Sequence, residues 1–471
     1  MEINLDREAK TPVYRQIVEQ VRTGILSGRL PLGSTLPTSR QLASQLGIVH
    51  LTAFKAYGEL QALGLVTPQP RRATRVVGKL PASLAVAALG RLTTDGPDAG
   101  YEPMSSSAGL RSMASSVPDP SLFQADELLT EIQALRNESP WLYYYCDSAG
   151  VPELLEQIRI LLAVDGIGCS TSDLLVTHGG THALSILLST MCRPDDAVLV
   201  QEPGPLGLRE LLASKGLTGV PVRLANDAVD LDHFRSLVAK HSPRAVLVSP
   251  DFGHGTGLCM PLESRLSLLQ AAASADVVVI EDRSFAAVDL DDSSVPPLAA
   301  LNPQQVCAIG SFSYSLAPGL RTGYLRAPED IRSACLARFK SEGISGVGFQ
   351  QLALARYIAR GAYSAHLDRV LPKYRIRRDA MLSSLKAWMP ANVSWTRPSG
   401  GFSTWISLGS ALNVERLYRR ALKAGVPFSP GGLFFVDSGS KLRLSYGLLE
   451  PEAIREAVRI LAGLIGPKQL Q

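Results

Sequence analysis

The sequence predicts an α/β protein with two domains: a small N-terminal domain of three helices and a β-hairpin, and a large domain built on a mainly parallel sheet. The chain has 471 residues, of which 46% are hydrophobic, and this is more than one ordinary core accommodates. Short apolar runs typical of buried strands alternate with helical stretches only in the second part of the chain. We therefore expect domains at residues 1–77 and 118–471, joined by a linker at 78–117.

The small domain is expected to contain three helices and a hairpin. From 11 to about 27 an apolar residue recurs every four positions, which is the period of a helix with one buried face. Segments 39–47 and 52–64 are also helical in pattern, and two short strands at 65–67 and 74–78 flank the turn PQPRRA. Three helices followed by a basic hairpin describe a winged helix-turn-helix.

Positive charge is concentrated at the N-terminal end. The net charge is only +4, but residues 1–80 contain 11 lysines and arginines against 5 acidic residues, which gives +6 there and −2 for the rest. This distribution is expected if only that end meets a polyphosphate such as double-stranded DNA. The linker that follows is rich in Ser, Gly and Ala, and its length of about 40 residues exceeds the usual connection inside a compact domain.

Several features predict a cytoplasmic protein. The segment MEINLDREAK carries three acidic residues and lacks the apolar region of a secretory signal. The longest apolar runs fall far short of the ~20 residues that cross a bilayer. The six cysteines are scattered singly, with no Cys-x-x-Cys pair and no histidine at metal-ligand spacing. We expect reduced thiols, no membrane segment and no metal site.

Five apolar runs in the second part predict the strands of the large domain. They are 173–178, 197–202, 245–250, 276–282 and 306–313. Ligands of such sheets bind outside the carboxyl ends of the strands, so the residues after each run are the place to look for a site. That rule selects the following residues: Gly179, Gly180, Asp251, His254, Asp282, Ser311 and Ser313.

The N-terminal motifs resemble the winged-helix domain of the GntR family of bacterial repressors. The specific parts are a G-R-L-x-x-G turn, L-P-T-S-R-x-L-A at the second helix and T-x-x-x-A-Y-x-x-L on the third. The resemblance implies that Arg40 touches DNA and that the third helix lies in the major groove, with His50 and Thr52 near base edges. The usual Ser-Arg-Asn before Thr52 reads Val-His-Leu here, which implies an altered or weaker sequence preference.

The wing departs from the family as well, because Arg71, Arg72 and Arg75 stand where glycines are usual. Such a wing suits contact with phosphates or the minor groove. The alternative is that these arginines only form a solvated hairpin. Likewise Arg40 and His50 could be ordinary surface residues, and Thr52 could serve as an N-cap.

Residues from about 117 to 465 resemble fold-type I aminotransferases, and the domain order resembles the MocR branch of the GntR family. Ten segments match in order, among them VTHGGTHAL, SPDFGHGTG, VVVIED, GSFSYSLAPGLRTGY and KLRLSYG. The resemblance implies a phosphate cup formed by the following residues: Gly179, Gly180, Thr181, Ser311, Ser313 and Arg321. It also implies that Asp282 pairs with the pyridine nitrogen of pyridoxal phosphate and that Arg443 clamps a substrate carboxylate.

Tyr314 is the decisive departure from that pattern. The family has at this position the lysine that forms the internal aldimine, and a phenol cannot form an imine. Other ring contacts differ too, because Pro205 and Ser284 replace tyrosines and His254 begins the segment that is usually Asn-Pro-Thr-Gly. The expectation is that no cofactor is held covalently and that no residue is catalytic in transamination. Pyridoxal or pyridoxamine phosphate bound non-covalently stays as an alternative.

These features favour a homodimeric DNA-binding transcription regulator whose large domain senses a small carboxylate or phosphate effector, or only dimerises. Two alternatives stay open. One is a pyridoxamine-phosphate-dependent enzyme in which His254 or Tyr314 supplies a proton, and the other is a DNA-binding protein without an effector. At single positions, His254 could be a solvent-facing loop residue, and Asp282 and Arg321 could be purely structural.

Overall fold

The computed structural model describes residues 3, 5, 12–26, 30, 34–62, 65–67, 74–76, 90–92, 101–103, 112–135, 144–225, 228–293, 295–409, 412–434 and 440–466. The chain divides into two compact units, Met1–Ala108 and Gly109–Gln471. In the described part of the chain, no helix is long and apolar enough to cross a membrane.

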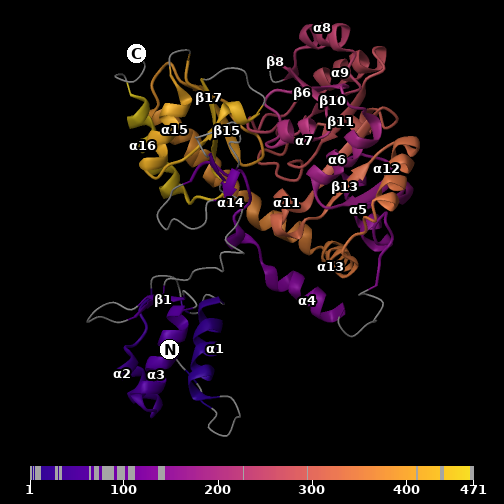
Figure 1. Ribbon diagram of the computed structural model, residues 1–471. Coiled ribbons are helices and arrows are strands. Elements are labelled where there is room, and N and C mark those ends of the chain that lie inside the picture. The colour runs from indigo at the N-terminus through magenta and orange to yellow at the C-terminus, as the bar shows by residue number, and fades with distance from the viewer. Residues whose placement is uncertain are drawn as a thin grey trace. The chain divides into compact units, whose positions relative to one another are not determined.

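The first unit contains the expected three helices and hairpin (Figure 1): α1 (Val13–Leu26), α2 (Ser39–Leu46), α3 (His50–Ala62), β1 (Val66–Thr67) and β2 (Arg75–Val76). Local chemistry fixes the ends of α2. The Thr38 side chain accepts from the Gln41 backbone N–H, and the Gln41 side chain bonds back to the Thr38 backbone, which forms a capping box. Gly47 ends the helix at φ 60°, a left-handed conformation that glycine adopts without strain.

The core of this unit is formed by one face of each helix. Ile17, Val21, Leu42, Ala53 and Leu60 are buried in it. The third helix begins two residues earlier than the sequence predicts, because His50 and Leu51 already have helical backbone. Further along, β3 (Gly90–Leu92) and β4 (Tyr101–Pro103) pair antiparallel within the segment expected to be a linker.

A seven-stranded sheet is the centre of the second unit, and its strand order is β5-β13-β12-β11-β10-β6-β7. Five neighbours from β12 to β7 run parallel, whereas β13 is antiparallel to both β12 and β5. The expected mainly parallel α/β sheet is therefore confirmed. Its strands are β5 (Leu174–Thr177), β6 (Ala197–Gln201), β7 (Thr218–Val222), β10 (Ala245–Val248), β11 (Val278–Asp282), β12 (Val306–Ser311) and β13 (Gly323–Arg326).

Strands β5, β6 and β10 are short, mostly apolar runs that are buried on both faces, as a covered parallel sheet requires. Helices from the intervening segments pack on them; α6 contacts β5, β12 and β13, for example. The helices are α4 (Ala125–Leu135), α5 (Pro152–Val164), α6 (Gly180–Met191), α7 (Leu208–Ser214), α8 (Leu231–His241), α9 (Leu262–Ser274), α10 (Leu298–Leu301), α11 (Phe312–Ser315), α12 (Glu329–Ser341) and α13 (Gly348–Ala359).

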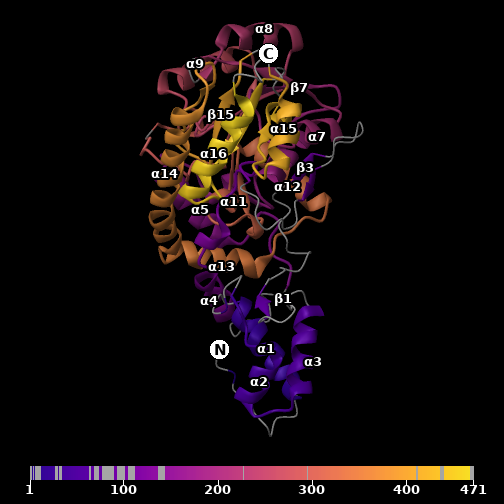
Figure 2. The ribbon, with the colours of Figure 1, turned by 90° about the vertical axis from the view of Figure 1, so that its left-hand side faces the viewer.

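A second, smaller layer was not foreseen from the sequence. The long helix α14 (Ala362–Trp388) leads to a four-stranded antiparallel sheet in the order β14-β15-β17-β16. Helix α15 (Val414–Lys423) packs on β16, and α16 (Pro451–Ile465) packs on α14 and α15. Figures 1 and 2 both show α15 and α16 beside β15. The strands are β14 (Ser394–Trp395), β15 (Ser403–Ser407), β16 (Ser429–Pro430) and β17 (Lys441–Ser445); a further pair, β8 (Leu224–Ala225) and β9 (Ala228–Val229), lies after β7.

Residues 112–116, which the sequence assigns to the linker, are structured in the second unit. Met113 is fully buried; its backbone N–H donates to the Pro427 carbonyl, and its own carbonyl accepts from the Ser445 N–H. The segment 112–116 is thus hydrogen-bonded to β17 of the small sheet.

Candidate functional site

Four of the six residues expected to contact DNA lie in described parts of the first unit. Arg40 is exposed on α2, and Arg75 is exposed on β2. His50 is the first residue of α3, and its Nε2 lies 3.0 Å from the hydroxyl of Ser39. Thr52 lies inside α3, so the alternative that it caps this helix is wrong. Arg71 and Arg72 lie outside the described residues.

In the second unit, a glycine turn and an arginine lie together at the end of β5. Gly179 has φ 91° and precedes the first turn of α6, so the backbone N–H groups of Gly180 and Thr181 are at a helix N-terminus. A Cβ at Gly179 would lie 2.9 Å from the Arg321 guanidinium. Arg321 is held there because its Nη2 donates to the His178 carbonyl at 2.8 Å.

Two serines at the end of β12 adjoin this turn. A Cβ at Gly180 would lie 3.6 Å from the Cβ of Ser311 and 3.0 Å from the hydroxyl of Ser284. The Ser311 hydroxyl accepts from the Ser313 N–H at 3.1 Å. Ser313 is buried, and its own hydroxyl has no hydrogen-bond partner among the described residues. We call Gly179, Gly180, Ser311, Ser313 and Arg321 the anion cup.

Asp282 ends β11 with both carboxylate oxygens engaged. Oδ2 lies 2.8 Å from Nε2 of His254, and Oδ1 accepts from the Ser284 N–H at 2.9 Å. Burial alone would raise the pKa of Asp282, but the imidazole of His254 and the hydrogen bonds of Ser284 outweigh burial and lower that pKa. His254 is 8% exposed, so the alternative of a solvent-facing loop residue is wrong.

Tyr314 lies beside this carboxylate, on α11. Its ring stacks on Phe285 with centroids 4.2 Å apart and planes 18° apart, and Phe285 in turn meets the His254 ring edge-on at 5.2 Å. Burial, and then the charge of Asp282, raise the pKa of the Tyr314 phenol, against the opposing charges of Arg443 and Arg321. Tyr314 is therefore a neutral phenol that lies in the field of all three charged residues.

Arg443 is buried in β17, between the buried Leu442 and Leu444. Its Nη2 donates to the Ala114 carbonyl at 2.7 Å and lies 3.3 Å from the Ser429 hydroxyl, and its guanidinium lies over the Phe434 ring at 4.6 Å. Ser429 also donates to the Ala114 carbonyl. Arg443, which was expected to bind a substrate carboxylate, therefore binds a backbone carbonyl of segment 112–116.

Asp251, which the sequence rule selects as a site residue, has a different role. Its carboxylate accepts from Arg265 at 2.6 Å and from Arg283 at 3.0 Å, and all three side chains are buried. Arg283 also pairs with Asp165. The Asp251, Arg265 and Arg283 side chains of this ion-pair network are buried. Apolar periodicity in the sequence gives no signal for such a cluster of charges.

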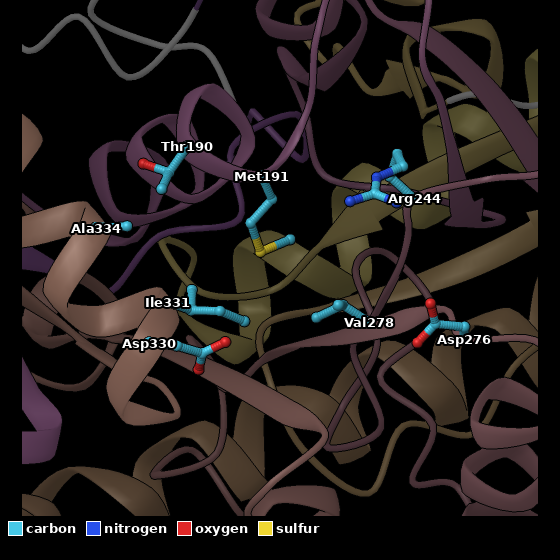
Figure 3. A pocket seen from close by; sticks show the side chains of 8 residues that line it. All are labelled: Thr190, Met191, Arg244, Asp276, Val278, Asp330, Ile331 and Ala334. Carbon is cyan, nitrogen blue, oxygen red and sulfur yellow. The ribbon is translucent and has the colours of Figure 1, made fainter.

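A separate hollow lies at the opposite end of the strands. Arg244 precedes β10 and Asp276 precedes β11, whereas Asp282 is at the carboxyl end of β11. Figure 3 shows Thr190 and Met191 of α6 and Asp330 and Ile331 of α12 around this hollow. It contains none of the residues that the sequence selects. Among the described residues, no group of His, Cys, Asp and Glu could hold a metal ion.

The fold and this arrangement define the class of protein: a helix-turn-helix unit joined to an aminotransferase-type α/β domain. Residues 116–461 match the aminotransferase class I and II family, and residues 13–76 match the gntR family of bacterial regulatory proteins. The chain belongs to the aminotransferase class I and II family over its large domain, and as a whole it is a GntR/MocR-type transcription regulator.

Relatives of both kinds support this assignment. The regulator TauR of Rhodobacter capsulatus is 31% identical over 96% of each chain, and the probable rhizopine catabolism regulatory protein MocR of Rhizobium meliloti is 28% identical over 97% of this chain and 94% of its own. The 2-aminoadipate transaminase of Thermus thermophilus is 31% identical over 75% of this chain and 89% of its own. The solved α-aminoadipate aminotransferase LysN of that organism aligns with a TM-score of 0.71, at 29% identity, over 77% of this chain and 93% of that one.

The residues present suit the phosphate group of pyridoxal phosphate but not its pyridine ring. The anion cup offers helix N–H groups, the unpartnered hydroxyl of Ser313 and a cation, which suit a phosphate. At the ring end, the carboxylate of Asp282 already has His254 and Ser284 as partners, and Tyr314 stacks on Phe285. Sequence reasoning selected Asp282 and His254 separately but missed that they bond to each other.

Proposed function

We propose that this regulator binds double-stranded DNA through its first unit and senses a small anionic ligand non-covalently in the second, without transaminase activity. The observation that carries the proposal is the 2.8 Å contact between His254 and Asp282. A carboxylate that keeps a pyridinium protonated must face the ring nitrogen, and one oxygen of this carboxylate already has an imidazole nitrogen as its partner.

Tyr314 supports the same proposal. It aligns with the position at which the aminotransferase pattern has its lysine, and a phenol supplies neither an imine nor an amine base. The raised pKa of the buried phenol keeps it protonated at neutral pH, so it does not replace the lysine as a base.

The anion cup and Arg443 indicate the ligand class. The cup suits a phosphate or a carboxylate, and Arg443 suits a carboxylate. A carboxylate at Arg443 would displace the carbonyl of Ala114, which belongs to the segment that connects to the DNA-binding unit. Ligand binding then breaks the hydrogen bond between Arg443 and Ala114 and loosens the segment that leads to the DNA-binding unit. The effector would alter DNA binding in this way. A homodimer, as in other two-fold regulators, would present paired winged helices to two half-sites.

The cofactor part of the proposal is tested by spectroscopy. The purified full-length chain, incubated with pyridoxal phosphate and borohydride, should show no aldimine band at ~420 nm and no added mass, because a Schiff base requires an amine. A stoichiometric borohydride-fixed adduct on a lysine of the second unit, formed at low pyridoxal phosphate concentration, would contradict the proposal. Thermal shift with amino acids, keto acids and phosphorylated metabolites then identifies the ligand class, since a true ligand stabilises the folded state.

The DNA part is tested by salt dependence. Arg40→Ala combined with Arg71→Ala and Arg72→Ala should weaken binding and reduce the slope of log K against log salt by ~0.9 for each DNA phosphate that is no longer neutralised. Arg416→Ala, an exposed arginine of α15, is the matched control. Unchanged binding and an unchanged slope in the triple variant would refute the assignment of these arginines.

A further inference from the structure

The outer face of α3 is exposed and largely apolar, although its Lys55 ammonium lies 4.1 Å from the centroid of the Tyr14 ring and its Phe54 ring lies 6.2 Å from the His50 ring. Leu51 and Phe54 are 71% and 61% exposed, and with Lys55 and Gly58 they form one helical stripe at spacings of three and four residues. The opposite face, which includes Ala53, is buried against α1 and α2. We call Leu51, Phe54, Lys55 and Gly58 the outer stripe.

The glycine in the outer stripe has no structural reason within this unit. Gly58 has helical backbone, its φ is not positive, and a Cβ there would meet no atom within 4 Å. Glycine inside a helix costs roughly 0.5–1 kcal/mol relative to alanine, so the position favours alanine for folding alone. A residue without a side chain on an exposed helix face is instead suited to close approach by a partner.

The charges and polar contacts around the stripe indicate DNA as that partner. Arg40 is exposed on α2, Lys55 is exposed within the stripe, and residues 1–80 carry a net charge of +6. His50, the polar residue at the start of the helix, has its Nε2 committed to Ser39. Apart from Thr52, the start of α3 is therefore poor in free hydrogen-bonding groups and rich in apolar surface, with Val49 also 72% exposed just before it.

Only one feature of the major groove matches an apolar side chain, and that is the 5-methyl group of thymine. We propose that Leu51 and Phe54 read thymine methyl groups, with Gly58 allowing the helix to come close to the groove floor. The inference rests on the proposed DNA-binding function and adds the base class that is read. The regulator accordingly prefers sites with thymines under the outer stripe, rather than sites read through guanine acceptors.

The experiment starts with the full-length chain and a random pool of duplexes, from which bound sequences are selected. The selected duplex is then made with deoxyuridine in place of single thymidines, which removes one methyl group and keeps every hydrogen-bonding group. Each contacted methyl should contribute about fourfold in affinity, from the ~0.8 kcal/mol of a buried methyl group. Leu51→Ala and Phe54→Ala should bind more weakly and lose this sensitivity to uridine.

Two further variants separate contact from folding. Gly58→Ala should raise the thermal midpoint of the first unit because alanine favours the helix, and yet weaken DNA binding because the added methyl blocks close approach. Val164→Ala, an exposed apolar residue at the end of α5, should leave both the affinity and the uridine effect unchanged.

Each contrary outcome has a distinct meaning. Equal affinity for the thymidine and uridine duplexes, with binding still salt-dependent, overturns methyl readout and leaves DNA binding intact. A loss of self-association in Leu51→Ala and Phe54→Ala, without a change in DNA affinity, also overturns it, because the stripe is then an interface between copies. No enrichment and no salt-dependent binding to any duplex overturns the proposed DNA function itself.

Discussion

His254 and Asp282 are hydrogen-bonded to each other, with Nε2 2.8 Å from Oδ2, although they come from the ends of two adjacent parallel strands, β10 and β11. The carboxylate that aminotransferase-type sites direct at a cofactor is thereby satisfied within the protein.

A lysine introduced at position 314 should not be enough to give tight cofactor binding. Tyr314→Lys should form an aldimine with pyridoxal phosphate only weakly, because His254 still holds Asp282. Tyr314→Lys with His254→Asn should bind at least about tenfold more tightly, since hydrogen bonds to charged groups contribute ~1.5–3 kcal/mol. Absorbance titration measures both, and Tyr314→Phe with His254→Asn is the control without an amine. Equal affinity of the single and double variants would contradict the role of His254.

Arg443 should hold the segment that enters the second unit. Arg443→Met removes a charged donor to the Ala114 carbonyl, and that bond contributes ~1.5–3 kcal/mol. Hydrogen exchange at the backbone amides of Met113 and Ser445 should therefore become about tenfold or more faster. Arg416→Met is the control, and unchanged protection in Arg443→Met would mean that the segment is held by its backbone bonds alone.

Asp251 should be essential for the stability of the second unit. It carries the charge that two buried arginines, Arg265 and Arg283, share. Asp251→Asn should lower the free energy of unfolding by ~3–5 kcal/mol, because it leaves the charge of the buried Arg265 without a carboxylate partner. Chemical denaturation followed by circular dichroism measures the change. Asp232→Asn, whose side chain is 96% exposed in its surface pair, should change it little; an equally small change at Asp251 would refute the network's role.

Stability should fall on mild acidification. Burial lowers the pKa of His366 to about 4, and burial likewise lowers the pKa of His182 to about 4. The unfolded chain, with histidine pKa ~6.5, binds more protons below that pH, so the free energy of unfolding decreases as the pH falls from 6.5 to 4. The buried His366 contributes up to about 3 kcal/mol of this loss.

Denaturation of wild type and His366→Gln at several pH values between 7 and 4 checks this expectation. The variant should show a shallower decline, because only His182 of the two is left to take up a proton on unfolding. His241→Gln, at the end of α8, controls for the loss of a histidine outside the core. A wild-type stability that stays constant from pH 6.5 to 4 would contradict the lowered pKa values.

Periodicity and motif spacing predicted the architecture well where each element is defined locally. The three N-terminal helices, the hairpin and the five apolar strands are short-range patterns, so they could be located to within a few residues. The small antiparallel sheet was missed because its strands, such as β14 and β16, are two residues long and depend on distant partners. For the same reason the burial of Met113 was not foreseen in a segment of loop-like composition.

The sequence by itself determined the domain order, the positions at the ends of the strands and the residue types there: an acid at 282, a phenol at 314 and a histidine at 254. Only the tertiary structure decided which of them meet. His254 contacts Asp282, Phe285 stacks on Tyr314 and Ala114 accepts from Arg443 across 28 to 329 residues of chain. Hydrogen bonds and ring stacking over such separations depend on side-chain packing that no local pattern encodes.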